Sequence, residues 1–91
     1  MRKKRDRLGV IYDFLRIIQE NNNSIKRTPL LRQSNLSSQS FSEYFDEMES
    51  KGFIREIEDK KAKRFITLTD KGFNYLNKYR MIKGFIEEFE L

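Results

Sequence analysis

Apolar side chains recur near the start of the chain at the spacing of one helical face. They stand three or four positions apart, at Leu8, Ile11, Leu15 and Ile18. This spacing predicts an amphipathic helix over about residues 5–20, which the polar run NNNS ends. Residues 25–27 then form a short extended piece. Thr28 suits an N-cap and Pro29 the first helical position, so we expect a short helix from Pro29 to about Ser34.

A second amphipathic stretch, NLSSQSFSEYFDEMESKGFI at residues 35–54, predicts the third helix. Its apolar residues share one face, which we expect to enter the core: Phe41, Tyr44, Phe45 and Met48. Two starts fit the sequence, either with Ser37 as the N-cap or with Ser40 and Glu43 as a capping box. Gly52 ends the helix in both cases.

Two strands and a long helix complete the pattern. Residues 53–57 and 64–68 flank the polar turn EDKKAK and predict a β-hairpin. Thr69 then caps a helix that continues to about Glu90. We therefore expect an α+β, mainly α fold: a helix-turn-helix with a two-stranded wing hairpin, a short third strand and an extended C-terminal helix.

The last helix carries more apolar residues than one small core covers easily. One stripe has the spacing of a coiled coil: Tyr75, Tyr79, Ile82, Ile86 and Phe89. Other faces hold a second set: Phe73, Leu76 and Phe85. We expect one set to pack on the core and the other to meet a second copy in a homodimer. The stripe is the set that we assign to the homodimer. The alternative is a helix folded back on its own core.

The composition excludes most catalytic chemistry. The 91 residues suffice for one small domain and include no Cys and no His. The chain therefore lacks zinc's usual ligands, disulfides and a Cys or His nucleophile-base pair. It also lacks a glycine-rich phosphate-binding loop. We expect a binding protein rather than an enzyme, with no metal and no cofactor.

The net charge of +5 is concentrated at the start of the chain, where residues 1–7 contribute +4. A basic balance is compatible with a nucleic-acid partner. No apolar run approaches the roughly 20 residues of a membrane span, and no signal-peptide core follows the basic start. These observations predict a cytoplasmic, nucleoid-associated protein that makes no membrane contact.

Two segments resemble winged helix-turn-helix transcriptional regulators, and in particular small archaeal regulators and chromatin proteins with a C-terminal dimerisation helix. NLSSQSFSEYFDEMESKGFI matches their turn and recognition helix, and FITLTDKGFNYL at residues 65–76 matches the junction of wing and last helix. The resemblance covers about residues 7–90. It implies a basic arm over residues 1–6, a winged helix-turn-helix domain over 7–74 and a dimerisation segment over 75–91.

The resemblance also implies which residues contact double-stranded DNA. The start of the recognition helix would meet base edges in the major groove through Ser38, Gln39, Ser40 and Ser42. The wing, residues 58–64, would meet phosphate through Lys60, Lys61, Lys63 and Arg64. Two features depart from the family's pattern, because the wing tip has no Gly and the recognition helix is acidic.

The acidic recognition helix, residues 37–51, admits three interpretations. Its net charge is −3, from Glu43, Asp46, Glu47 and Glu49 against Lys51, and these carboxylates would repel phosphate. If the uncharged N-terminal end enters the groove, Glu43 is placed to accept from a cytosine amino group. Otherwise the acids form a solvated face, or the face of Glu43, Asp46 and Glu47 binds a basic protein partner.

Basic residues around the short second helix favour DNA. Lys26, Arg27 and Arg32 flank it and would frame the serine-rich start of the recognition helix, although they also suit ordinary surface charge. The N-terminal arm would lie in the minor groove or along phosphates, or form a solubilising tail. The preferred hypothesis is a dimeric, sequence-specific DNA-binding regulator. The alternatives are an architectural DNA binder and a winged helix that binds protein.

Overall fold

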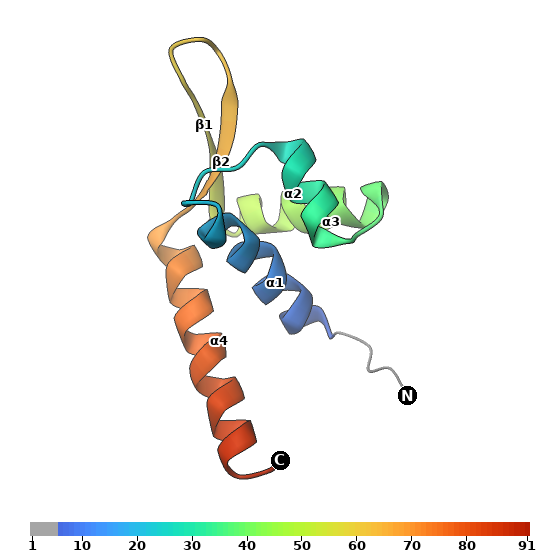
Figure 1. Ribbon diagram of the computed structural model, residues 1–91, viewed down its shortest axis with the longest axis vertical. Coiled ribbons are helices and arrows are strands. Elements are labelled where there is room, and N and C mark those ends of the chain that lie inside the picture. The colour runs from blue at the N-terminus through green and yellow to red at the C-terminus, as the bar shows by residue number, and fades with distance from the viewer. Residues whose placement is uncertain (1–5) are drawn as a thin grey trace.

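Within residues 6–91, which the computed structural model describes, the chain forms four helices and one β-hairpin (Figure 1). Residues 1–5, most of the predicted basic arm, lie outside the described part. Apart from the short third strand, the element order agrees with the prediction. In chain order the elements are α1 (Arg7–Glu20), α2 (Arg27–Ser34), α3 (Ser38–Ser50), β1 (Ile54–Glu58), β2 (Arg64–Leu68) and α4 (Asp70–Glu88).

Local capping fixes the ends of α3 and the start of α4 as predicted. Ser37 Oγ accepts from the Ser40 N–H at 3.1 Å, so the first of the two predicted starts of α3 is confirmed. Thr69 Oγ1 accepts from the Gly72 N–H at 3.2 Å. Gly52 follows the end of α3 with a φ of +79°, a conformation that glycine adopts without a Cβ clash.

The start of α2 differs from the prediction. The helix begins at Arg27 rather than Pro29, and its N-cap is Lys26 rather than Thr28. Pro29 lies within the first turn, where it is tolerated because backbone N–H groups there have no intrahelical partner. Since Arg27 already belongs to the helix, the predicted third strand is reduced to a single bridge, from Ile25 to β2.

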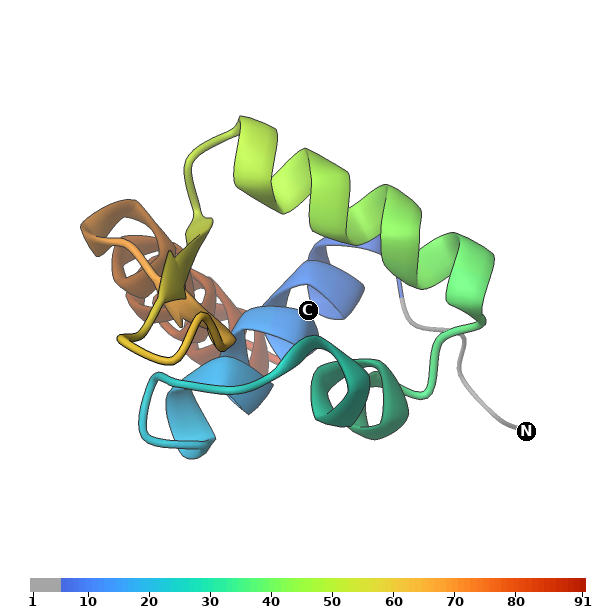
Figure 2. The same cartoon turned by 90° about the horizontal axis from the view of Figure 1, so that it is seen from above.

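One hydrophobic core lies between the first three helices, the base of the hairpin and the start of α4. In Figure 2, α1 runs through the middle of the view with α3 on one side and α2 on the other. The predicted core face of α3 is confirmed: Phe41, Phe45 and Met48 are buried, and Tyr44 is half-buried at its edge. Leu8, the first residue of the predicted α1 stripe, is instead 55% exposed.

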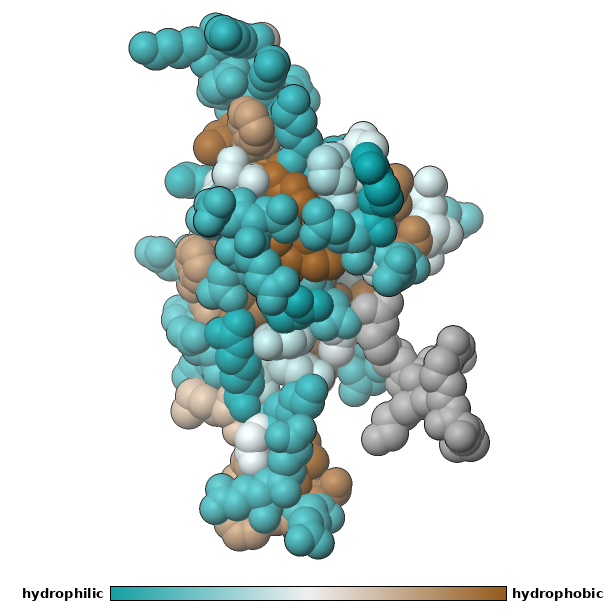
Figure 3. All heavy atoms as spheres, viewed as in Figure 1, coloured by the Kyte–Doolittle hydropathy of each residue, from teal (hydrophilic) through white to brown (hydrophobic). Residues whose placement is uncertain are grey.

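The hairpin has a buried base and a projecting tip. β1 and β2 are antiparallel, with Ile54 opposite Leu68. These two residues and Ile66 are buried, whereas residues 55–58 are exposed. The far half extends away from the helices as a wing (Figure 1), and its surface is hydrophilic on the side seen in Figure 3.

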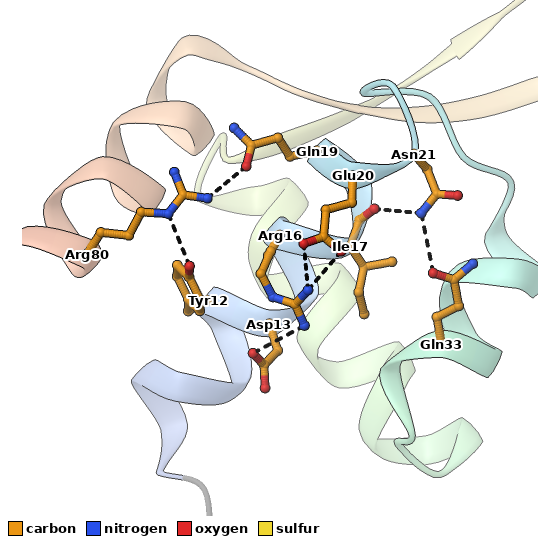
Figure 4. A network of polar contacts seen from close by, with 9 residues as sticks. All are labelled: Tyr12, Asp13, Arg16, Ile17, Gln19, Glu20, Asn21, Gln33 and Arg80. Carbon is orange, nitrogen blue, oxygen red and sulfur yellow. Dashed lines mark hydrogen bonds and ion pairs between the residues drawn. The ribbon is translucent and has the colours of Figure 1, made fainter. Parts of the chain in front are cut away.

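The first half of α4 is attached to α1 by aromatic and polar contacts. Tyr79 stacks on Tyr12 with ring centroids 4.5 Å apart. The Arg80 guanidinium donates to the Tyr12 hydroxyl at 3.1 Å and to the side-chain carbonyl of Gln19 at 2.9 Å (Figure 4). Beyond Arg80 every residue of α4 is exposed, and the helix continues away from the core.

Tyr75 gives this attachment a dependence on pH. Its hydroxyl donates to the Leu8 carbonyl oxygen at 2.8 Å. Burial, reinforced by neighbouring Tyr79, raises the pKa of Tyr75 to about 12 from an ordinary value of 10.0. The folded state therefore favours the neutral phenol, so this contribution to stability is complete below pH 10 and is lost as the pH rises through about 12.

We expect Tyr75→Phe to lower the free energy of unfolding by up to about 1 kcal/mol near pH 8, because one hydrogen bond is lost. The same variant should lose less stability than the parent protein as the pH rises from about 10 to about 12. Urea unfolding of both proteins across this range measures both effects. Identical pH dependences in the two proteins would contradict the prediction.

Candidate nucleic-acid interface

The turn between α2 and α3 is held by two polar residues. Asn35 ends α2 in the left-handed conformation, with a φ of +59°, which asparagine adopts more readily than most residues. Ser34 is buried, and its Oγ donates to the Leu31 carbonyl at 2.7 Å and accepts from the Leu36 N–H at 3.3 Å. These contacts set the direction in which α3 leaves α2.

The N-terminal end of α3 presents an uncharged surface. Because its apolar face points into the core, the opposite face of the helix meets solvent. Of the predicted base-contacting residues, Ser38, Gln39 and Glu43 are exposed, and Ser40 and Ser42 are half-exposed. The exposed side chains of the first turn are therefore neutral hydrogen-bonding groups.

The carboxylates of α3 differ in their surroundings. Glu47 forms an ion pair with Arg7 at the start of α1 and a second one, at 2.8 Å, with Lys51. Within residues 6–91 the other three make no ion pair and are exposed: Glu43, Asp46 and Glu49. The negative charge that α3 presents is thus smaller than the sequence count suggests.

Adjacent cations at the start of α2 reach toward different elements. The Arg27 guanidinium lies over two rings of α3, 4.3 Å from the centroid of Phe45 and 5.3 Å from that of Phe41. Lys26 Nζ lies 5.8 Å from the ring centroid of Phe65 in β2. Both side chains remain exposed, so each packs on a neighbouring element while its charge stays at the surface.

The third predicted cation beside α2 is placed differently. Arg32 is exposed in the last turn of α2, at the far end of the helix from Lys26 and Arg27. Lys26 and Arg27 therefore lie beside the wing strand β2 and beside α3, whereas Arg32 stands at the end of α2 that leads through residues 35–37 into the start of α3.

Asp59 builds the wing tip. Its Oδ1 accepts from the backbone N–H groups of Lys61 and Lys63 at 2.8 and 2.9 Å, and its carbonyl accepts from the Ala62 N–H at 3.0 Å. Ala62 has a φ of +64°, the position that glycine usually occupies in a three-residue hairpin loop. An alanine in the left-handed conformation thus replaces the glycine that the family pattern places here.

The wing tip directs positive charge outward. Residues 58–64 carry four cations against two carboxylates, a net of +2, and the Asp59 carboxylate is occupied by backbone N–H groups. Arg64 approaches Glu58 at 3.9 Å. The remaining cations are exposed and form no ion pair within the described part of the chain: Lys60, Lys61 and Lys63.

The sequence matches the winged helix-turn-helix family over residues 4–87, nearly its whole length. The chain belongs to the winged helix-turn-helix family. No individually curated protein matches it.

Solved structures share this winged helix fold at low sequence identity. Sso10a-2, a DNA-binding protein from Sulfolobus solfataricus, has a TM-score of 0.74 at 14% identity over 94% of this chain and 86% of its own. The PcaV transcriptional regulator from Streptomyces coelicolor has a TM-score of 0.66 at 16% identity, over 88% of this chain and 63% of its own. A MarR-family transcriptional regulator from Silicibacter pomeroyi has a TM-score of 0.65 at 17% identity, over 90% of this chain and 59% of its own. This chain spans about three-fifths of the latter two.

Two contacts of this winged helix were missed from the sequence. Glu47 and Lys51 stand four positions apart on one helix, which is a recognisable ion-pair spacing, but no local pattern signals Arg7, which is 40 positions away. The stacking of Arg27 on Phe45 also joins distant residues. Within residues 6–91 no cluster of carboxylates could hold a metal ion, and none of the helices has the length and apolar character to cross a membrane.

We expect Ala62→Gly to stabilise the wing tip, because glycine adopts the left-handed conformation without the strain that alanine has there. The greater conformational entropy of glycine in the unfolded chain offsets only part of this stabilisation. Amide exchange at Lys63 should slow about twofold to fivefold, which corresponds to roughly 0.5–1 kcal/mol. Asp59→Ala should accelerate the same exchange, because it removes the acceptor. Unchanged exchange in both variants would show that the tip is not organised by these contacts.

Proposed function

We propose that this chain is a homodimeric, DNA-binding transcriptional regulator, with α3 in the major groove and the wing on phosphate. The observation that carries the proposal is the distribution of charge over α3 and its neighbouring elements. The exposed side chains of the first turn of α3 are neutral, and exposed cations stand on the elements before and after this helix, namely α2 and the wing tip. This distribution suits a polyanion whose base edges are read by hydrogen bonds.

The acids of α3 are compatible with a helix that enters the groove by its N-terminal end. Gln39 would then offer an amide to adenine, and Glu43 a carboxylate to the cytosine amino group. Asp46 is about 10 Å farther along the helix than Gln39, at 1.5 Å per residue. Glu47 is already paired with two cations.

The proposed dimer surface is the far part of α4. Of the predicted stripe, Tyr75 and Tyr79 are half-buried against α1 of the same chain. The rest of the stripe is at least 41% exposed and available to a partner: Ile82, Ile86 and Phe89. Apolar groups gathered in this way mark an interaction surface. A twofold dimer would present two copies of α3 to half-sites about 34 Å, or a multiple of that, apart.

The similar structures support this function. Sso10a-2 is a DNA-binding protein, and the other two are transcriptional regulators. A regulator of this kind would act in the cytoplasm, with the nucleoid, by binding rather than by catalysis. A basic protein partner for the exposed Glu43 and Asp46 is the second candidate, and architectural coating of DNA is the third.

Selection from a pool of random-sequence duplexes tests the proposal. We expect a palindromic motif that Gln39→Ala blurs, with a loss of about 1–3 kcal/mol of discrimination at the affected position. Combined alanine substitution of Lys60, Lys61 and Lys63 should weaken all duplexes alike, because phosphate contacts carry no sequence information. Sequencing the retained duplexes and titrating the best of them measure both effects.

Asn74→Ala, an exposed substitution on α4, is the matched control and should alter neither motif nor affinity. Retention of duplexes without an enriched motif would favour the architectural binder. Failure to retain duplexes even at low salt would favour a protein partner for the acidic face.

DNA binding should weaken steeply with salt. If each protomer neutralises roughly four phosphates, the slope of log K against log salt is about −7 for the dimer. Removing the three wing lysines from each protomer should make the slope shallower by about 5, since each lost phosphate contact removes about 0.9. Fluorescence anisotropy titrations across a series of salt concentrations measure both slopes, and a nearly flat response would contradict the proposal.

A further inference from the structure

Three acids of α3 are neighbours on the surface of the helix. Glu43 and Glu47 are four positions apart, and Asp46 stands three positions after Glu43. Glu47 is ion-paired with Arg7 and Lys51. Among the described residues Glu43 and Asp46 are exposed and form no ion pair. Because neighbouring like charges are unfavourable for a helix, a counter-charge beside Glu43 and Asp46 would stabilise α3.

The chain that leads into α1 carries the opposite charge. Four consecutive cations stand before Asp6: Arg2, Lys3, Lys4 and Arg5. Asp6 is the one acid among residues 1–7, and its Oδ1 accepts from the Gly9 N–H at 2.7 Å to cap α1. The segment therefore keeps a large excess of positive charge, which acids on another element can attract.

Arg7 brings this basic segment beside the acids of α3. Its guanidinium is ion-paired with Glu47, so the start of α1 lies next to the acidic group. Glu43 is one helical turn, about 6 Å, from Glu47 along the axis of α3. Residues 1–5 span at most about 17 Å when extended, which exceeds this rise. The basic segment is therefore long enough to reach Glu43 and Asp46.

We propose that residues 2–5 lie beside Glu43 and Asp46 of α3 in the DNA-free protein and are displaced by phosphate when DNA binds. The intramolecular contact needs no partner, whereas its displacement rests on the proposed DNA-binding function. Because the same cations attract phosphate, the contact is autoinhibitory: every duplex must separate the cations from the carboxylates before α3 enters the groove. The contact lowers the affinity for all duplexes alike, so base contacts decide which of them are retained.

Amide NMR shifts of the DNA-free protein test the contact in the absence of DNA. One variant neutralises the segment: Arg2→Gln, Lys3→Gln, Lys4→Gln and Arg5→Gln together. We expect it to move the amide signals of Glu43 and Asp46 at low salt. The difference should vanish near 1 M salt, where the Debye length is about 3 Å. Glu49 is the internal control, because it stands about 200° around α3 from Glu47 and its amide signal should stay in place.

Duplex affinities of single and combined variants test the displacement. With Glu43→Gln the segment is already less tightly held, so its neutralisation should weaken binding of random-sequence duplexes about threefold more than in the parent protein. Glu49→Gln is the matched control, because it removes an exposed carboxylate from another side of the same helix. In that background neutralisation should cost the same as in the parent. Fluorescence anisotropy at low salt measures these affinities.

Unmoved Glu43 and Asp46 signals overturn the contact and leave these carboxylates to solvent or to a basic protein partner. Moved signals with additive affinities overturn the displacement, because the contact then persists in the complex with DNA. Absence of duplex binding in every variant overturns the proposed function, and the NMR comparison still decides whether the contact exists.

Discussion

The packing of Phe41 against Phe14 orients α3, and the rest of the interface depends on that orientation. The two ring centroids are 5.4 Å apart, and both side chains are almost completely buried. Because the apolar face of α3 is committed to this contact, its other face must meet solvent, and that face holds the proposed reading residues. Arg27 lies over the neighbouring Phe45 ring, so the aromatic cluster that orients α3 also places a cation beside it.

The net charge of the surface formed by α3 and the wing tip depends on which carboxylates are paired as well as on the composition. Residues 37–51, which contain α3, carry a net charge of −3, but Glu47 is paired with Arg7 and Lys51. At the wing tip Asp59 is turned toward backbone N–H groups, while the lysines around it point outward unpaired within the described residues. Both arrangements make the surface more favourable to a polyanion than the residue counts suggest, because the occupied carboxylates repel phosphate less.

The division of α4 runs along the helix rather than around it. One face was expected to return to the core and another to meet a partner, but the division falls near Arg80. Before that point Tyr79 stacks on Tyr12 and Leu76 is fully buried; after it all residues are exposed, Phe85 included. The reason is length: 19 residues of helix, about 28 Å at 1.5 Å per residue, extend past the core that they cover.

The sequence by itself determined the four helices, the hairpin, the core face of α3 and the cap at Thr69, and it limited the start of α3 to two positions, because periodicity and capping depend on residues a few positions apart. The tertiary structure decided the early start of α2, the pairing of Glu47 with Arg7, the stacking of Arg27 and the point where α4 leaves the core. These features join residues distant along the chain. Their energies depend on distances and burial that exist only after folding, and no local pattern encodes them.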